Sequence, residues 1–282
     1  MEKRYILYVL IVIVCIIALG IGVYAQIFYK NADTDKLMVG ATANQTQISQ
    51  VNQTEEKIKT EFNNIFTNTL NYVNKNIKTT ATRRDMSKDL VYTSNQVSKT
   101  EKGKYEMNIN IPTVNIVSDN AEQINDEIEK IFVTKATSIL STNGAAYTIY
   151  NIDYIAYVNN NILSLAIRAT LKEGDNPQRV MFMTYNYNLE NGSILTLNDI
   201  MQAKGLSNST VQNKITKEIK EISKKTEDLK NIGYTVYSRN ADDSMYKLEN
   251  TKSYFIGENS YLYILYPYGN TNNTSEVDIV VF

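Results

Sequence analysis

Histidine is absent from this chain of 282 residues, and its only cysteine is Cys15. Without histidine, the chain cannot supply a histidine general base, a nucleophile activated by histidine, or a histidine ligand for zinc. A single thiol also excludes an internal disulfide. Tryptophan is absent as well, which lowers the chance of a carbohydrate-stacking platform. An enzyme built on this chain would have to use carboxylate, lysine, tyrosine or serine side chains.

An excess of charge of either sign is also missing. The chain has 29 lysines and arginines against 30 aspartates and glutamates, which gives a formal net charge of -1. No basic field indicates a nucleic acid partner, and no acidic excess indicates a cationic one. Hydrophobic residues make up 43% of the chain, enough for one large or two small domains with a buried core.

The longest apolar run, Tyr5–Phe28, contains no charged residue. A bilayer core about 30 Å thick needs roughly 20 apolar helical residues, so this run can cross it. Lys3 and Arg4 precede the run, and positive charge favours the cytoplasmic side. We therefore expect a cytoplasmic stub at residues 1–4, a transmembrane helix at 5–28, and an extracytoplasmic domain on a single-pass plasma membrane anchor.

A cleaved signal peptide is the alternative interpretation of this run. Lys3 and Arg4 would form its positive region, and Val23-Tyr24-Ala25 offers a small-residue cleavage pattern. However, the apolar core from Ile6 to Val23 exceeds the length of about 7 to 15 residues that signal peptides use. The anchor is therefore favoured over secretion after cleavage near Ala25.

Residues 29–53 are polar and rich in Thr, Asn and Gln, which is typical of a linker. From 54 to 78, apolar residues recur at spacings of three and four and predict an amphipathic helix. They are Ile58, Phe62, Ile65, Phe66, Leu70, Val73 and Ile77. We expect this helix to pack on its own domain. The alternative is a coiled-coil stalk that forms a homodimer.

Residues 79–142 are predicted to form a small βα subdomain. The stretch 79–104 is polar and indicates a linker with one short strand near Leu90–Tyr92. Tyr105–Ile111 alternates apolar and polar residues, and Pro112 is predicted to end that strand. A helix follows, and its buried stripe is predicted to contain Ile124, Ile128, Ile131, Phe132 and Ile139.

Residues 143–282 are predicted to form an antiparallel α+β subdomain. Three alternating stretches are joined by short polar loops, which favours antiparallel pairing because a parallel crossover needs a dozen or more residues. The opposite faces of these strands are predicted to be solvated, and they carry Ser164, Arg168, Thr170, Thr184, Asn186 and Asn188. A helix with a solvated Lys/Glu face is predicted near 209–225, followed by strands at 253–256, 261–266 and 277–282. The expected fold is thus α+β: an N-terminal transmembrane helix, then an antiparallel-sheet ectodomain of two subdomains with helices packed on one face.

The order of these segments resembles a known family. The segment YEMNINIPTVNI, residues 105–116, is similar to the first extracytoplasmic subdomain of the anti-sigma-V factor, which also precedes the catalytic domain of some peptidoglycan deacetylases. The second subdomain of that factor is matched by Leu163-Ser164-Leu165, Thr184-Tyr185-Asn186, Asn191-Gly192, Leu195 to Asp199 and Tyr266-Pro267-Tyr268. The resemblance covers roughly Tyr105 to Phe282, and its motifs are structural rather than catalytic.

The resemblance implies an α+β ectodomain that binds lysozyme and thereby triggers release of a sigma factor. This chain departs from the family before its apolar run, where four residues stand in place of a sigma-binding domain. We therefore do not expect it to sequester a sigma factor by itself. Deacetylase activity is not expected either, because the zinc site of those enzymes uses histidines.

Few side chains are candidates for ligand binding. Arg168 suits a carboxylate or phosphate ligand, although a cross-strand ion pair is the simpler interpretation. Tyr157 and Tyr268 suit a recognition surface, and core packing is their alternative role. Asp242 and Asp243 are adjacent, but no regularly spaced oxygen ligands surround them, so a solvated turn is expected. No catalytic residue, cofactor or metal is predicted.

The leading hypothesis is a membrane-anchored, extracytoplasmic binding or sensor-like domain at the bacterial cell wall. Its predicted partners are the lipid bilayer, through Tyr5–Phe28, and either lysozyme, another wall protein or peptidoglycan. One alternative is a carboxylate-based cell-wall hydrolase or modifying enzyme. The other is a structural stalk that oligomerises through residues 54–78. No nucleic acid partner is expected.

Overall fold

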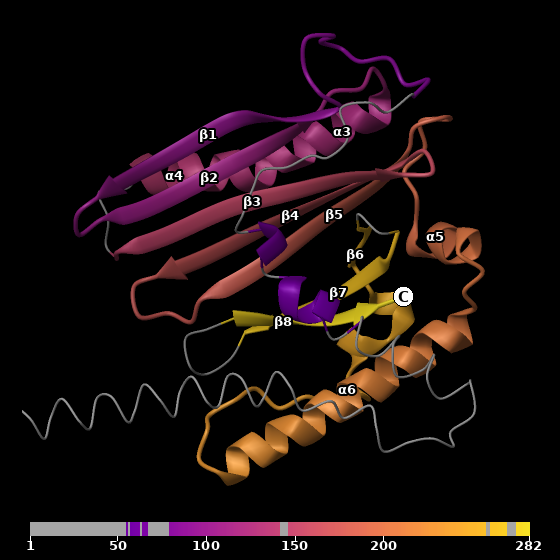
Figure 1. Cartoon of the computed structure of the whole chain (residues 1–282). Helices are drawn as coiled ribbons and strands as arrows, with labels where there is room; N and C mark the ends of the chain where they lie inside the picture. Colours follow the sequence, from indigo (N-terminus) through magenta and orange to yellow (C-terminus); the bar gives the residue numbers. More distant parts are fainter. Residues whose placement is uncertain are drawn as a thin grey trace, which may run out of the picture. The chain divides into compact units, whose positions relative to one another are not determined.

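The computed structural model describes residues 55, 57–62, 64–66, 79–141, 146–257, 260–269 and 275–282. The predicted cytoplasmic stub, transmembrane helix and linker lie outside these ranges. Within them, no helix combines the length and the apolar character needed to cross a membrane. The described residues belong to one compact unit, Glu55–Phe282, which is α+β and contains two sheets with helices (Figure 1).

The larger sheet has five strands in the order β1-β2-β3-β4-β5. They are β1 (Val91–Glu101), β2 (Tyr105–Val114), β3 (Thr148–Asn159), β4 (Ile162–Glu173) and β5 (Arg179–Asn188). Neighbours pair antiparallel except β2 and β3, which are parallel. The prediction of an antiparallel sheet is wrong at this junction, because the helical segment between β2 and β3 is long enough for the crossover that a parallel pair needs. Residues 79–142 and 143–282 therefore contribute to one mixed sheet.

Strand β1 is much longer than the short strand predicted near Leu90–Tyr92. It runs over 11 residues at the edge of the sheet, and most of its side chains are exposed or half-buried. An edge strand with little buried surface needs no apolar alternation, so its polar sequence resembles a linker. Pro112 does not end β2 as predicted. It lies opposite Thr93, where the register between β1 and β2 shifts before Asn95, and such a break in the strand pairing tolerates proline.

One face of the five-stranded sheet is covered by helices (Figure 1). These are α3 (Asp119–Ile128), the π-helical turn η2 (Glu129–Val133) and α4 (Thr134–Ser141). Ser118 caps α3, since its hydroxyl accepts a hydrogen bond from the Ala121 amide at 3.1 Å. The core on this face contains Ile109, Ile124, Ile128, Phe132, Ile152, Leu165, Ile167 and Tyr187.

The other face is buried by a second sheet, so the prediction that its polar side chains are solvated is wrong. The second sheet has three antiparallel strands: β6 (Ser253–Ile256), β7 (Leu262–Gly269) and β8 (Ser275–Val281). Ser164 and Asn186, on the covered face, are 0% and 1% exposed. Their hydroxyl and amide groups meet the backbone of another strand instead of water.

A row of polar side chains on β4 and β5 binds the open edge of β6. The Tyr254 amide donates to Thr184 Oγ1 at 2.9 Å, and Asn186 Nδ2 donates to the Tyr254 carbonyl at 3.0 Å. The Ile256 amide donates to Ser164 Oγ at 3.1 Å, and that hydroxyl donates to Asn186 Oδ1 at 2.6 Å. The edge strand of the small sheet is therefore satisfied by side chains rather than by another strand.

Helical residues between 55 and 66 pack at the junction of the two sheets. Phe62 and Phe66 are buried against Phe182, and Phe255 and Tyr263 complete the aromatic cluster. These two phenylalanines pack on their own domain, as the first interpretation of the predicted 54–78 helix requires. A homodimer through that stretch would have to use other side chains. Residues 67–78 lie outside the described part of the chain.

Helix α6 (Asn208–Asn231) covers the outer face of the three-stranded sheet with Val211, Ile215 and Ile219. It follows the short helix α5 (Leu197–Ala203), and the 3-10 turns η3 (Ser244–Tyr246) and η4 (Leu248–Asn250) precede β6. The predicted solvated Lys/Glu face of α6 is partly wrong. Glu218 is 9% exposed and forms ion pairs with Lys214 of the same helix and with Lys59, and the pair with Lys59 joins α6 to the N-terminal helical residues.

We predict that Asn186→Ala lowers the free energy of unfolding of the full chain by about 2–3 kcal/mol, because the buried Ser164 hydroxyl loses its acceptor and the Tyr254 carbonyl loses its donor. Urea denaturation followed by far-UV circular dichroism measures the change. Asn108→Ala, at an exposed position of β2, is the matched control and should stay within about 0.5 kcal/mol of the parent. Equal losses in the two variants would show that the polar row contributes no specific stability.

Candidate functional site

The outer side of β5 is the open edge of the five-stranded sheet. Ser253 Oγ donates to the Phe182 carbonyl at 3.0 Å, and the Leu195 amide donates to the Asn186 carbonyl at 2.7 Å. Carbonyls of even-numbered residues therefore point away from β4. In an antiparallel strand the amide of the same residue points the same way. Val180, Phe182 and Thr184 consequently present backbone groups to the outside of the sheet.

Two clefts lie along this edge and share Val180, Met181 and Pro267. The larger, of about 650 Å³, is lined by Ile131, Lys135, Tyr150, Ala169, Leu171, Arg179, Val180, Met181, Pro267 and Tyr268. The smaller, of about 540 Å³, is lined by Val180, Met181, Phe182, Ser244, Met245, Asn250, Lys252, Ser253, Leu265, Tyr266 and Pro267. We call these two clefts together the β5 groove. Its floor is a strand edge, and its walls are mostly apolar.

Positive charge predominates in the β5 groove. Lys135 and Arg179 both pair with Glu173, with Lys135 Nζ at 2.8 Å from Glu173 Oε1. Lys252 lines the smaller cleft, and no described residue forms an ion pair with it. Three cations against one carboxylate leave a local excess of two positive charges. No acidic side chain is among the described residues that line either cleft.

Titration of the groove residues follows from these contacts. The hydrogen bond from Lys135, assisted by the charge of Arg179, lowers the pKa of Glu173. Burial raises the pKa of Tyr150 to about 12, and that of Tyr266 likewise to about 12. Both phenols are therefore protonated at neutral pH. They can serve as hydrogen-bond donors but not as bases.

Arg168 lines a third cavity, of about 470 Å³, with Lys59, Thr170 and Gln178, and this cavity shares Val180 with both clefts of the β5 groove. Its Nη2 is 3.7 Å from Asp153 Oδ2 on the adjacent strand, and its guanidinium lies 4.7 Å from the ring centre of Phe66. The simpler interpretation of Arg168 as one half of a cross-strand ion pair is the arrangement observed. Burial raises the pKa of Asp153, a cost that the contacts with Asn110 and Arg168 partly offset.

The two candidate tyrosines lie in different places. Tyr157 is 8% exposed and belongs to the core between the two sheets, so it does not contribute an exposed recognition surface. Tyr268 lines the larger cleft and stacks on Tyr237 with ring centres 4.6 Å apart. The structure therefore does not bring Arg168, Tyr157 and Tyr268 together in one cleft. The groove residues Val180, Met181 and Lys252 were not singled out from the sequence, because edge position depends on topology.

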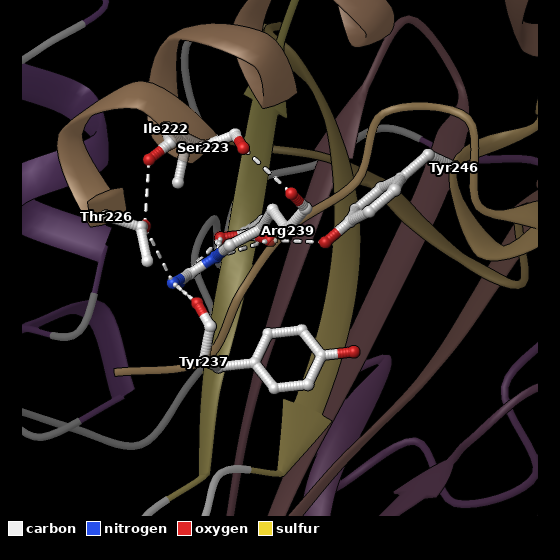
Figure 2. Close-up of polar contacts among 7 residues, drawn as sticks. Ile222, Ser223, Thr226, Tyr237, Arg239 and Tyr246 are labelled. Atoms are coloured by element: carbon white, nitrogen blue, oxygen red, sulfur yellow. Dashed lines mark hydrogen bonds and ion pairs between the residues drawn. The ribbon is translucent and has the colours of Figure 1, made fainter. Parts of the chain in front are cut away.

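Arg239 and Asp278 form the most buried ion pair among the described residues (Figure 2). Arg239 Nη2 lies 3.2 Å from Asp278 Oδ1, and Tyr246 donates its phenol to Asp278 Oδ2 at 2.8 Å. Figure 2 shows Arg239 also reaching Thr226 of α6 and the carbonyl of Tyr237. All of these partners belong to the chain itself. The cluster therefore ties α6, the segment before η3, and β8 together.

No metal site is found in the described residues, where no group of three His, Cys, Asp or Glu side chains could hold an ion. The neighbouring carboxylates singled out from the sequence lie in a turn. There, the Asp242 amide donates to Asn240 Oδ1 at 3.0 Å, and the Asp243 amide donates to the Asn240 carbonyl at 3.0 Å. This is the arrangement expected of the solvated turn.

We predict that Asp278→Asn lowers the free energy of unfolding by about 3 kcal/mol or more, because the buried guanidinium of Arg239 loses its counter-charge. Urea denaturation of the full chain measures this change. Arg179→Gln, which removes an exposed ion pair with Glu173, is the comparison and should cost at most about 1 kcal/mol. A loss below about 1 kcal/mol in Asp278→Asn would contradict the role assigned to the buried pair.

A second prediction concerns pH. Because the pKa of Glu173 is lowered by folding, its carboxylate stabilises the folded chain above the unfolded value of 4.5, and this stability is lost as pH falls through the folded value. The stability advantage of the parent chain over Glu173→Gln should therefore grow as pH rises from about 3 to 6. Denaturation midpoints across this range provide the test.

Glu218→Gln supplies a control of opposite sign. Burial raises the pKa of Glu218 despite its contact with Lys59, so the contribution of this group falls as pH rises above 4.5. The free energy of unfolding of the parent chain should fall relative to that of Glu218→Gln as pH rises over the same range. The same trend in both variants would contradict the assigned environments.

No protein-family model matches the chain, and no curated protein matches its sequence. Among solved structures, a DUF3298 family protein from Pseudomonas aeruginosa PAO1 is 11% identical, covers 67% of this chain and 83% of its own, and gives a TM-score of 0.35. A DUF3298 family member from Bacteroides fragilis is 14% identical, covers 72% of this chain and 92% of its own, and gives a TM-score of 0.37. Scores this low support no inference about this chain, whose function is therefore argued from its own residues.

Proposed function

We propose that this chain is a membrane-anchored, extracytoplasmic binding domain at the bacterial cell wall that acts without catalysis. The observation that carries the proposal is the β5 groove: two clefts with mostly apolar walls beside β5, with a cationic excess from Lys135, Arg179 and Lys252. Such a surface suits retention of a partner by contact. Its buried phenols, Tyr150 and Tyr266, stay protonated and do not supply a base.

Two sequence features support the proposed location. The uncharged run Tyr5–Phe28 with Lys3 and Arg4 before it is typical of an anchor whose following domain lies outside the cytoplasm. The only cysteine lies inside that run, so the proposed outer domain needs no disulfide in an oxidising compartment. The candidate partners, lysozyme or a wall component such as peptidoglycan, come from the resemblance to the anti-sigma-V ectodomain.

A carboxylate-based hydrolase is the second candidate, and Asp153 is the observation in its favour. Burial raises the pKa of this carboxyl, and it contacts Arg168, which lines the 470 Å³ cavity. Glycoside hydrolysis needs a second carboxylate across the cleft. Asp278, which lines the same cavity, is bound to Arg239 and Tyr246. We therefore rank catalysis second.

We predict that the full chain in lipid nanodiscs binds immobilised lysozyme or sedimented peptidoglycan and releases no soluble wall fragment. Co-sedimentation and surface plasmon resonance measure binding, and liquid chromatography of the supernatant measures turnover. Empty nanodiscs are the control. If the chain binds neither lysozyme nor peptidoglycan, both candidate partners are refuted. Fragment release that Asp153→Asn abolishes would instead establish the hydrolase.

A further inference from the structure

We propose that the third cavity is a binding site for a small organic carboxylate, whose head is held by Arg168 and Lys59 and whose body lies against apolar side chains. This inference goes beyond the proposed function, because it assigns a low-molecular-weight ligand to a cavity other than the β5 groove. It does not depend on the binding of lysozyme or peptidoglycan. The cavity volume of about 470 Å³ lies within the range of small-molecule sites, about 300–1,000 Å³.

The cavity lies on the face of the five-stranded sheet that the second sheet covers. Arg168 and Thr170 of β4 project from the same face as Ser164, because side chains two residues apart share one face of a strand. Phe182 and Val180 of β5 are their cross-strand neighbours. The walls on the other side are Ile222 of α6, Val277, Asp278 and Ile279 of β8, and Lys59. Side chains from both sheets, from α6 and from the N-terminal helical residues therefore surround one cavity.

Arg168 has hydrogen-bonding capacity that the described residues do not use. Its side chain is 16% exposed, and its Nη2 lies 3.7 Å from Asp153 Oδ2, which is too long for a hydrogen bond. The other oxygen of Asp153 accepts a hydrogen bond from Asn110 Nδ2 at 3.3 Å. A guanidinium carries five donors in a planar fork that matches a carboxylate. A carboxylate in the cavity would therefore supply the acceptors that Asp153 leaves missing.

The lining of the cavity is cationic, although each cation has an ion-pair partner. Glu218, the partner of Lys59, does not line the cavity. Asp153, the partner of Arg168, does not line it either. Asp278 is the one acidic residue among the described lining residues, and its two oxygens are already bound in the buried ion-pair cluster. A ligand with one negative charge would therefore be attracted to this lining.

The remaining lining residues suit a carboxylate with an apolar body. Thr170 and Gln178 add polar groups, and no described residue forms a hydrogen bond with the side chain of either. The apolar lining residues are Val180, Phe182, Ile222, Val277 and Ile279. Small-molecule sites typically combine such apolar walls with a few polar groups that fix the orientation of the ligand. A phosphate dianion would bring a second negative charge toward Asp278, so a monoanion suits the cavity better.

The experiment uses the full chain in nanodiscs and para-fluorophenylpropanoate as the probe. Broadening of its fluorine NMR line at low salt should saturate with a Kd below about 10 mM. The corresponding amide has the same shape without the charge and should bind at least about tenfold more weakly. Empty nanodiscs correct for partition of the probe into lipid. Equal affinity for carboxylate and amide, or no saturable binding below about 10 mM, would overturn the proposal.

Arg168 is tested together with Asp153, because removing the guanidinium alone would leave a partly buried carboxylate without its counter-charge. The double variant Asp153→Asn/Arg168→Gln removes both charges, and its affinity for the carboxylate probe should fall about tenfold or more. Lys217→Gln, which removes an exposed cation of α6, is the matched control and should change the affinity less than about threefold. A folded double variant that binds the probe as the parent does would refute the site.

Thr170→Val is a second variant that keeps the shape of the side chain. It removes a hydroxyl that has no hydrogen-bond partner among the described residues, so the fold should persist. Its affinity for the carboxylate probe should fall about threefold or more. Circular dichroism checks that each variant folds. If the double variant does not fold, Thr170→Val decides, and an affinity equal to that of the parent refutes the proposal.

Discussion

The hydrogen bonds between the polar row of the large sheet and the edge of β6 decide how the two sheets can pack. Backbone amides and carbonyls buried without partners cost roughly 1–3 kcal/mol each, so an edge strand cannot be laid on an apolar sheet face. Thr184 accepts a hydrogen bond from the Tyr254 amide, and Asn186 donates one to the Tyr254 carbonyl. Ser164 accepts a hydrogen bond from the Ile256 amide. With these partners the edge of β6 can be buried, and Phe62 and Phe66 fill the space beside it.

This packing also accounts for the position of the β5 groove. The part of β5 near Thr184 and Asn186 uses its side chains to hold β6, and its outer backbone at Asn186 is bound by Leu195. Toward Arg179, the neighbouring surfaces are instead the segment from Ser244 to Ser253 and the end of β7 at Pro267, which line clefts rather than pair with the strand. One strand thus holds β6 in one half and lines the two clefts in the other.

Sequence periodicity predicts the α+β class, the three strands β3, β4 and β5, and the helix that Ser118 caps, because one face of each is apolar. Periodicity wrongly predicts that the polar face of β4 and β5 is solvated, because the alternating pattern that contains Ser164 and Asn186 is the same whether these side chains bind water or a backbone. It also misses the parallel pairing of β2 with β3, because the length of the connection permits a parallel pair without requiring one. The β5 groove could not be predicted, since Val180 and Met181 have the sequence of ordinary sheet residues and only strand order makes them an edge.

The near-neutral net charge of the chain does not describe the electrostatic potential at the β5 groove. Some charges cancel locally because they are paired within the chain, as Arg168 is with Asp153 and Arg239 with Asp278. At the β5 groove, Glu173 is the ion-pair partner of both Lys135 and Arg179, and Lys252 has no ion pair among the described residues. The electrostatic effect of such a local imbalance extends over about 10 Å at moderate ionic strength. The balance of 29 basic and 30 acidic residues therefore does not determine the charge that a partner of the β5 groove would carry.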